Sequence, residues 1–115
     1  MITIYHNPKC SKSREGLKLI QDSGKEFQVR NYIKESLSEK ELEDILRKLN
    51  MAPIQLVRKN ESLWKDKYEG KDLSDNEIKR ILLENPKLIE RPVVENENGA
   101  VIGRPSLNIE NLLKF

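Results

Sequence analysis

The apolar residues of this chain change their spacing twice along its length, and these changes limit the folds that it can adopt. A β-prone run at residues 2–5 is followed by an Asn-Pro turn and then by helical spacing that begins at Ser11. Gly24 is a typical stop after a helix, and residues 27–32 alternate loosely, as a second strand would. The chain therefore opens as strand, loop, helix and strand, which is the first half of an α/β domain.

The middle of the chain has the spacing of helices. Ser38 and Ser74 each stand three residues before a glutamate, a pattern typical of a capping box, in which the two side chains satisfy each other's backbone N–H groups. Pro53 is predicted to open a further short helix. Apolar residues follow each predicted cap at helical spacing: Leu42, Ile45, Leu46 and Leu49 after the first, and Ile78, Ile81 and Leu82 after the second. A helical insertion is therefore predicted at about residues 34–87, between two ends that contain strands.

The last third of the chain returns to strands. Two apolar runs flank Asn98-Gly99, which is a strong signal for a two-residue hairpin loop. With these two residues as the loop, Val93 faces Arg104, and Arg91 becomes a diagonal neighbour of Arg104, about 7–8 Å away on the same sheet face. Each arginine also precedes a proline. Two cations gathered in this way favour an anion between them, so the open end of the hairpin is a candidate anion site.

A short helix at residues 108–114 completes the order β-α-β, helices, β-β-α. A chain of 115 residues favours one domain, and this order is that of thioredoxin-like folds. We therefore predict a single α/β (α+β) domain with a small mixed sheet. Its thioredoxin-like core is expected at about residues 1–33 and 88–115, with the helical insertion between them.

The chain has one cysteine, Cys10, and one histidine, His6. One cysteine cannot form an intramolecular disulfide, and the two residues together cannot supply the nitrogen and sulfur ligands of a zinc site. Cys10 follows the first strand and precedes the first helix, whose leading N–H groups lack partners and favour anions. Its neighbours in the chain are polar, which favours a reactive thiolate over an inert buried cysteine.

Charge and hydropathy argue against two broad classes of partner. Lysines and arginines number 21 against 19 acidic residues, a net charge of +2, and no run of five like charges occurs. Binding to nucleic acid or to a membrane surface is therefore not predicted. The N-terminus lacks the pattern of a signal peptide, and the apolar runs are far shorter than the about 20 residues of a membrane span. We expect a cytoplasmic protein with a reduced thiol.

Four segments, in order along the chain, carry a resemblance to a known family. They are HNPKCSKSR at residues 6–14, LVRKN at 56–60, RPVV at 91–94 and GRP at 103–105. Together they closely resemble the glutaredoxin-linked arsenate reductases of the ArsC family, and the likeness covers nearly the whole chain. The resemblance implies a thioredoxin-like core with a helical insertion, in agreement with the organisation predicted above.

The resemblance also implies a role for each matching residue. Cys10 matches the nucleophile that attacks arsenate, and the three arginines that bind the oxyanion and the later arsenite adduct match Arg58, Arg91 and Arg104. Glutathione then attacks the adduct, and glutaredoxin removes the glutathione left on the cysteine as arsenite leaves. Glutathione is thus a co-substrate, and no bound cofactor or metal is expected.

Five further residues are expected to support the thiol. His6 matches a histidine that tunes the thiol, and Pro92 matches a proline that is cis in thioredoxin-like folds and lies beside the thiol. Ser11, Ser13 and Arg14 complete the loop around the cysteine. The best-known members of the family have glycine at the position of Ser11, so this loop departs from theirs at one residue.

Two other functions compete with arsenate reduction. Transcriptional regulators of the Spx type share the fold and bind RNA polymerase, but they generally use a C-x-x-C switch, whereas here Ser13 stands three residues after Cys10. A monothiol glutaredoxin-like oxidoreductase would act on glutathione mixed disulfides and would need no arginine trio. Charge-neutral replacement of Arg91 and Arg104 separates this second alternative from an oxyanion enzyme, because only the oxyanion enzyme would lose activity.

Overall fold

The computed structural model describes residues 1–114, and the chain divides into two compact units. The first, which we call the sheet unit, comprises residues 1–35 and the chain from Arg91 onward. The second, which we call the helical unit, comprises residues 36–90. Within the described residues, no helix combines the length and the apolar composition that crossing a membrane requires.

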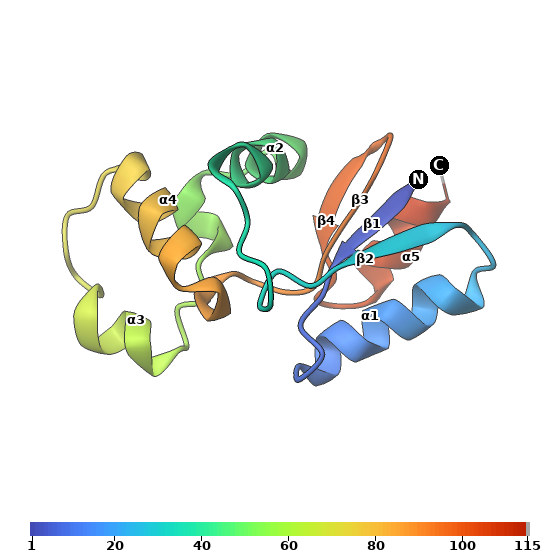
Figure 1. Cartoon of the computed structure of the whole chain (residues 1–115), viewed down its shortest axis with the longest axis horizontal. Coiled ribbons are helices and arrows are strands. Elements are labelled where there is room, and N and C mark those ends of the chain that lie inside the picture. Colours follow the sequence, from blue (N-terminus) through green and yellow to red (C-terminus); the bar gives the residue numbers. More distant parts are fainter. Residues whose placement is uncertain (115) are drawn as a thin grey trace. The chain divides into compact units, whose positions relative to one another are not determined.

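The sheet unit contains a mixed four-stranded sheet, whose strands are labelled in Figure 1. They are β1 (Ile2–Tyr5), β2 (Phe27–Arg30), β3 (Val93–Asn96) and β4 (Gly99–Ile102), in the spatial order β2-β1-β3-β4. β1 and β2 are parallel, and the other two pairs are antiparallel. A parallel pair needs a crossover, which here is α1 (Ser11–Asp22). The predicted α/β organisation with a small mixed sheet is confirmed.

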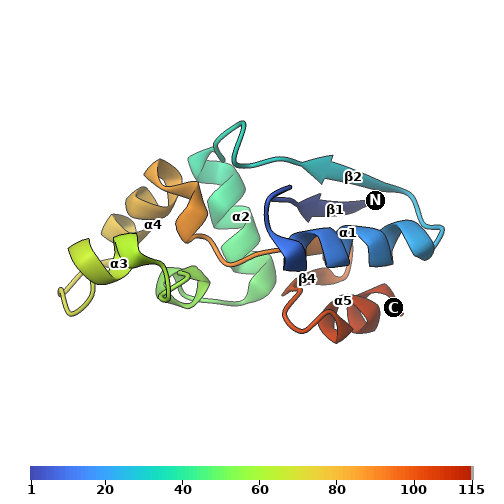
Figure 2. The ribbon, with the colours of Figure 1, turned by 90° about the horizontal axis from the view of Figure 1, so that it is seen from below.

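The core of the sheet unit lies between the sheet and two helices. In β1, Ile2 and Ile4 alternate with Thr3 and Tyr5, so the two isoleucines share one face. α1 packs against α5 (Leu107–Leu113), and Figure 2 shows the two helices side by side. Both helices join the sheet in one buried apolar cluster, made of Ile2, Ile4, Ile20, Val94, Ile109 and Leu113. This cluster anchors α1 on the sheet, one short loop after the end of β1.

The helical unit contains three α-helices and two 3₁₀ turns. They are α2 (Glu39–Leu49), η1 (Pro53–Leu56), α3 (Ser62–Lys67), α4 (Asp75–Glu84) and η2 (Pro86–Leu88). α4 packs against α2, η1 and η2. The buried apolar side chains of these elements are Leu42, Ile45, Leu46, Leu49, Leu56, Trp64, Ile78, Ile81, Leu82 and Leu88. The short helix α3 was not predicted, because fewer than two turns do not show a helical period.

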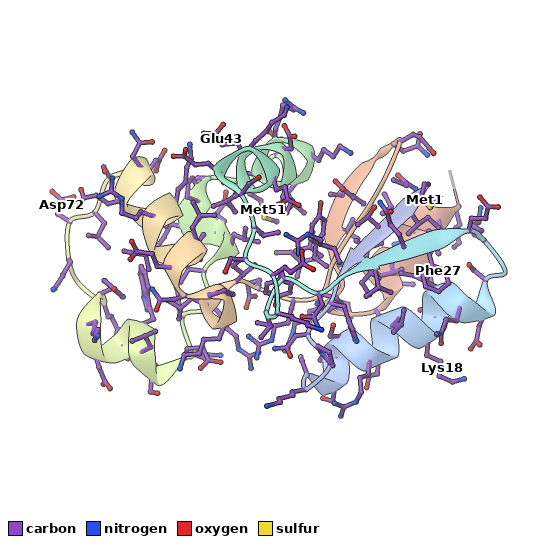
Figure 3. The ribbon with its side chains drawn as sticks, viewed as in Figure 1. Met1, Lys18, Phe27, Glu43, Met51 and Asp72 are labelled. Atoms are coloured by element: carbon purple, nitrogen blue, oxygen red, sulfur yellow. The ribbon has the colours of Figure 1, made fainter. Side chains whose placement is uncertain are left out.

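The longer helices are amphipathic. Lys18 of α1 and Glu43 of α2 are exposed and point away from the ribbon in Figure 3. Ile20 and Leu42, from the same two helices, are completely buried. Each helix therefore turns an apolar face toward the core of its own unit and a charged face toward solvent.

Both predicted capping boxes are present. The Ser38 hydroxyl oxygen accepts the N–H of Glu41 at 3.1 Å, and the Glu41 carboxylate accepts the N–H of Ser38 at 2.9 Å. Ser74 and Glu77 form the same pair of hydrogen bonds at 3.2 and 3.1 Å. Because these bonds satisfy N–H groups that lack partners within the helix, α2 and α4 begin where the sequence indicates.

The predicted register of the β3–β4 hairpin is wrong. Asn96 pairs with Gly99, so Glu97 and Asn98 form the loop in place of Asn98 and Gly99. The Asn96 side chain explains the shift, because its Oδ1 atom accepts the N–H of Asn98 at 2.8 Å and closes the turn one residue earlier. Gly99, with a φ of 151°, then begins β4.

The corrected register still brings the two arginines of the hairpin together. Val93 pairs with Ile102, and not with Arg104 as the sequence predicts. The ladder continues beyond the strands, since the N–H of Gly103 donates to the carbonyl of Pro92 at 2.7 Å. Arg91 and Arg104 are therefore directly opposite each other, and not diagonal neighbours as the sequence predicts.

Two predicted boundaries also differ slightly from the structure. β2 ends at Arg30 and not at residue 32, because the Asn31 side chain accepts the N–H groups of Ile33 and Lys34 in a turn. α5 begins at Leu107, one residue earlier than expected.

Replacing Ser38 with alanine removes the cap of α2, and we expect the free energy of unfolding to fall by about 1 kcal/mol. Ser106 is a matched control, because it is the N-cap residue of α5 but its side chain makes no capping bond. Ser106→Ala is expected to change the free energy of unfolding by at most about 0.5 kcal/mol. Urea denaturation measures both values, and equal losses would contradict the stabilising role of the box.

Candidate active site

Cys10 is the N-cap residue of α1. Its backbone is extended, with φ −95° and ψ 123°, and its N–H donates to the carbonyl of Asn7 at 3.0 Å. The residue is buried, with 8% of its surface exposed. The Cys10 side chain makes no capping hydrogen bond, but it lies at the start of α1, where the leading N–H groups lack partners within the helix and favour an anion.

The surroundings of this thiol stabilise its charged form. Burial raises the pKa of the thiol, but the Ser13 N–H, the Arg91 side chain and the Lys12 N–H favour the anion and together outweigh burial, with the charge of Arg91 acting in the same direction. The net result is that the pKa of Cys10 is lowered to about 7. About half of the thiol is then ionised at pH 7, against a few per cent for an ordinary cysteine.

Two arginines from the open end of the hairpin converge on the thiol. The Nη2 atom of Arg104 lies 3.4 Å from the Sγ atom of Cys10. The Nε atom of the same guanidinium donates to the carbonyl of Arg91 at 2.8 Å, which fixes the orientation of the Arg104 guanidinium plane. Both arginines precede cis prolines, Pro92 and Pro105. The structure thus brings the cysteine together with two of the three arginines that the sequence singles out.

Ser13 connects His6 to the loop that carries the thiol. The Nδ1 atom of His6 lies 2.6 Å from the Ser13 hydroxyl oxygen, which also accepts the N–H of Asn7 at 3.0 Å. Both His6 and Ser13 are buried. Burial, and after it the charge of Arg14, lower the pKa of His6. We therefore assign a neutral imidazole whose Nδ1 atom accepts the Ser13 proton and whose Nε2 atom carries hydrogen.

Further hydrogen bonds hold the loop between β1 and α1. The Nη1 atom of Arg14 donates to the carbonyl of Pro8 at 2.9 Å, and the N–H of Lys9 donates to the side chain of Asn7 at 3.0 Å. Ser11 is exposed at the first position of α1. Arg14 therefore braces the loop, whereas Ser11 forms part of its surface.

Arg58 belongs to the helical unit, where it follows η1. Its N–H donates to the carbonyl of Leu88 at 2.6 Å, and its Nε atom lies 3.5 Å from a carboxylate oxygen of Glu61. The Nη1 atom is buried and makes no hydrogen bond with any residue from 1 to 114. One donor of this guanidinium therefore has no partner among residues 1–114.

The arrangement around Cys10 suits nucleophilic attack on an oxyanion. A thiolate is a strong nucleophile, while guanidinium forks and helix N–H groups bind anionic oxygens. Among residues 1–114, no group of three or more His, Cys, Asp or Glu side chains is placed to hold a metal ion. Cys10, Arg91 and Arg104 form a candidate site for covalent chemistry on an anionic substrate.

Comparison with known protein families agrees with this site. The model of the ArsC family matches residues 5–112. The chain belongs to the ArsC family. The match includes Cys10, Arg58, Arg91 and Arg104, and it confirms the resemblance that the four sequence segments indicate.

Relatives of this ArsC-family chain cover almost all of its length. The arsenate reductase of Haemophilus influenzae is 38% identical over 114 residues, which are 97% of this chain and 98% of the relative. The uncharacterized protein YfgD of Escherichia coli is 40% identical over 106 residues, 90% of this chain and 89% of its own length. The solved structure of the arsenate reductase from Vibrio cholerae has a TM-score of 0.90 at 39% identity and covers 96% of each chain. The predicted thioredoxin-like architecture is confirmed.

Two functional groups of this ArsC-family site were missed by sequence reasoning, because they are not side chains. They are the backbone N–H groups of Lys12 and Ser13, which lower the pKa of Cys10. Their signal lies in position alone, because the N–H groups at the second and third positions of a helix face the N-cap side chain. Once Cys10 is recognised as the N-cap residue, both groups follow from helix geometry.

Because the chain has one cysteine, alkylation reports on Cys10 alone. We expect the alkylation rate of the folded protein to rise with pH around a midpoint of about 7, and that of the urea-unfolded chain around about 8.5. Since the folded pKa is the lower one, the thiolate adds stability above the unfolded pKa, and this stability is lost as the pH falls through about 7. Iodoacetamide kinetics measure both midpoints, and a folded midpoint at the unfolded value would contradict a stabilised thiolate.

Ser13→Ala is expected to lower the free energy of unfolding by about 1–3 kcal/mol, because it leaves the buried His6 nitrogen and the Asn7 N–H without their partner. Ser11→Ala is the matched control, since Ser11 is exposed, and its change should stay within about 0.5 kcal/mol. Denaturant titration measures the free energy of unfolding of both variants. Equal stabilities would show that the Ser13 hydroxyl does not hold the loop.

Proposed function

We propose that this protein is an arsenate reductase that converts arsenate to arsenite through Cys10, with glutathione and glutaredoxin as reductants. The observation that carries the proposal is the contact between the Arg104 guanidinium and the buried Cys10 thiol, 3.4 Å from Nη2 to Sγ. A cation in this place favours both the thiolate and an oxyanion beside it. The relatives that are named arsenate reductases support arsenate as the oxyanion.

In the first step, the Cys10 thiolate attacks the arsenic atom of arsenate. An S–As bond forms, an As–O bond breaks, and the oxygen leaves as hydroxide, which takes a proton to become water. Arsenate is a mixture of the monoanion and the dianion at neutral pH, so the approaching thiolate meets strong repulsion. Each guanidinium within about 4 Å offsets roughly 4 kcal/mol of gross interaction at an effective dielectric constant near 20. Arg91 and Arg104 therefore make the approach feasible.

In the second step, the thiolate of glutathione attacks the sulfur of the adduct. A disulfide forms between glutathione and Cys10 while the S–As electron pair stays with arsenic, so As(V) is reduced to As(III) and arsenite leaves. The thiolate of glutaredoxin then attacks the glutathione sulfur of this disulfide, and the Cys10 thiolate leaves. The second thiol has to come from another molecule, because the chain has one cysteine.

Arg58 is proposed as the third oxyanion ligand. It stands in the LVRKN segment that resembles the family's motif, and its Nη1 atom is buried without a hydrogen bond to residues 1–114. A buried guanidinium donor that no protein group satisfies is stabilised by an anionic oxygen. The bidentate fork of arginine suits a tetrahedral oxyanion better than a lysine would.

The remaining predicted residues are proposed to support the thiol without touching the arsenic. Ser13 and His6 hold the start of α1 against the loop, and Arg14 braces the Pro8 carbonyl. Pro92 follows Arg91 and helps to place it. No bound cofactor is required, and a cytoplasmic location, where glutathione is abundant and reduced, remains the prediction.

An assay that couples glutathione reductase to NADPH oxidation tests the proposal. With arsenate, glutathione and glutaredoxin present, we expect turnover that requires all three and disappears in Cys10→Ser, because serine does not supply a thiolate. Absence of arsenate-dependent turnover in the wild-type protein would refute the assignment.

Arginine variants in the same assay test oxyanion binding. We expect Arg91→Gln and Arg104→Gln each to lower kcat/KM for arsenate by about 10²–10³-fold, and Arg58→Gln by at least about tenfold. Arg47→Gln is the control, because Arg47 lies on the surface of α2, paired with Asp44, and its loss should leave kcat/KM unchanged. Full activity on glutathione mixed disulfides in the Arg91 and Arg104 variants, without arsenate turnover in any form, would favour the monothiol oxidoreductase.

A further inference from the structure

Two glycines of the sheet unit, Gly16 in α1 and Gly103 after β4, adjoin the same pair of side chains. A Cβ atom added to Gly16 would lie 2.9 Å from Ile109 Cδ1 and 3.0 Å from Pro92 Cγ. A Cβ atom added to Gly103 would lie 2.7 Å from Ile109 Cδ1 and 2.9 Å from Pro92 Cγ. Neither glycine is among the residues with positive φ. Space, and not backbone conformation, therefore requires glycine at both positions.

The two neighbours of these glycines differ in how they respond to crowding. Ile109 is completely buried, but the end of its side chain has rotamers to explore. The ring of Pro92, which is also buried, is closed onto its own backbone nitrogen, so beyond a change of ring pucker it moves only if the backbone moves. A methyl group at Gly16 or Gly103 would therefore displace the main chain at Pro92.

The main chain at Pro92 is directly connected to the groups that meet the thiol. The carbonyl of Pro92 accepts the N–H of Gly103 at 2.7 Å. The preceding residue, Arg91, accepts the Arg104 Nε through its own carbonyl at 2.8 Å. The same guanidinium places Nη2 3.4 Å from the Cys10 Sγ. A displacement of this segment is thus carried to both arginines.

We propose that Gly16 and Gly103 are positioning residues: they form a notch that seats the Pro92 ring and thereby sets the distance of Arg91 and Arg104 from the Cys10 sulfur. This inference rests on the proposed function in one respect, since the site that the notch sets is the one proposed to bind arsenate. Glycine is among the least favourable residues inside a helix, so its place in the buried face of α1 agrees with a demand for room.

Gly16→Ala and Gly103→Ala test the notch through the thiol itself. We expect the alkylation midpoint of Cys10 to rise from about 7 by about one unit or more, because displaced arginines stabilise the thiolate less. The alkylation rate at pH 7 should then fall several-fold, while the rate at high pH, where the thiol is fully ionised, does not fall. The shorter contacts at Gly103 predict the larger shift for Gly103→Ala.

Gly24→Ala is the matched control, with the same chemical change in the same unit. Gly24 has a φ of 74°, and nothing lies within 4 Å of its added Cβ atom. This variant should lose stability through its backbone, yet keep the midpoint near that of the wild type. If Gly16→Ala and Gly103→Ala also lose stability and keep the wild-type midpoint, the glycines are merely packing residues and the proposal fails.

An Ile109→Val background keeps the test decisive if Gly103→Ala alone does not fold. Valine removes Cδ1, which makes the shortest contact at both glycines, and leaves the contact with Pro92. Within this background the alanine variants should fold and still show a raised midpoint. A return to the wild-type midpoint would place the coupling in Ile109 and overturn the role of Pro92. Because alkylation needs no arsenate, its outcome is independent of whether the coupled assay shows turnover.

Discussion

The buried thiolate of Cys10 is the feature on which the rest of the site depends. A charged sulfur in a residue that is 8% exposed is stable only if donors and cations replace the water around it. The chain supplies them from two directions, namely the first turn of α1 and the two arginines of the hairpin. These segments meet because β1 lies beside β3 and runs antiparallel to it, so that Tyr5, just before the thiol loop, pairs with Val93, just after Arg91 and Pro92.

The presence of one cysteine limits how much of the proposed reaction the site completes without another molecule. In the proposed reaction, one thiolate forms a bond to arsenic, but the reduction needs a second sulfur, and the chain has one cysteine. The position three residues after Cys10 holds Ser13, whose hydroxyl hydrogen-bonds His6 and the loop backbone. A serine here braces the loop where a second cysteine would resolve a disulfide. In the proposed reaction, the need for an outside thiol therefore follows from the local sequence.

Features that depend on neighbouring residues could be predicted from the sequence. The capping boxes at Ser38 and Ser74 form as expected, because each box joins groups three residues apart. The hairpin was predicted, but its register was not, because Asn96 competes for the turn through its own side chain. The predicted and the observed register both bring Arg91 and Arg104 to the open end of the hairpin, so their convergence could be predicted although the register was wrong. In the structure the two residues are direct neighbours.

By itself, the sequence determined the order of the strands and of the longer helices, the place of Cys10 at a helix start and the segments that mark the ArsC family, because each is encoded within a few consecutive residues. Only the tertiary structure decided that the arginines of the hairpin meet the thiol, and that Gly16 and Gly103 leave room for Pro92 beside them. These contacts join residues far apart in the chain. Their geometry follows from strand pairing and from the packing of two helices on the sheet, which no local pattern specifies.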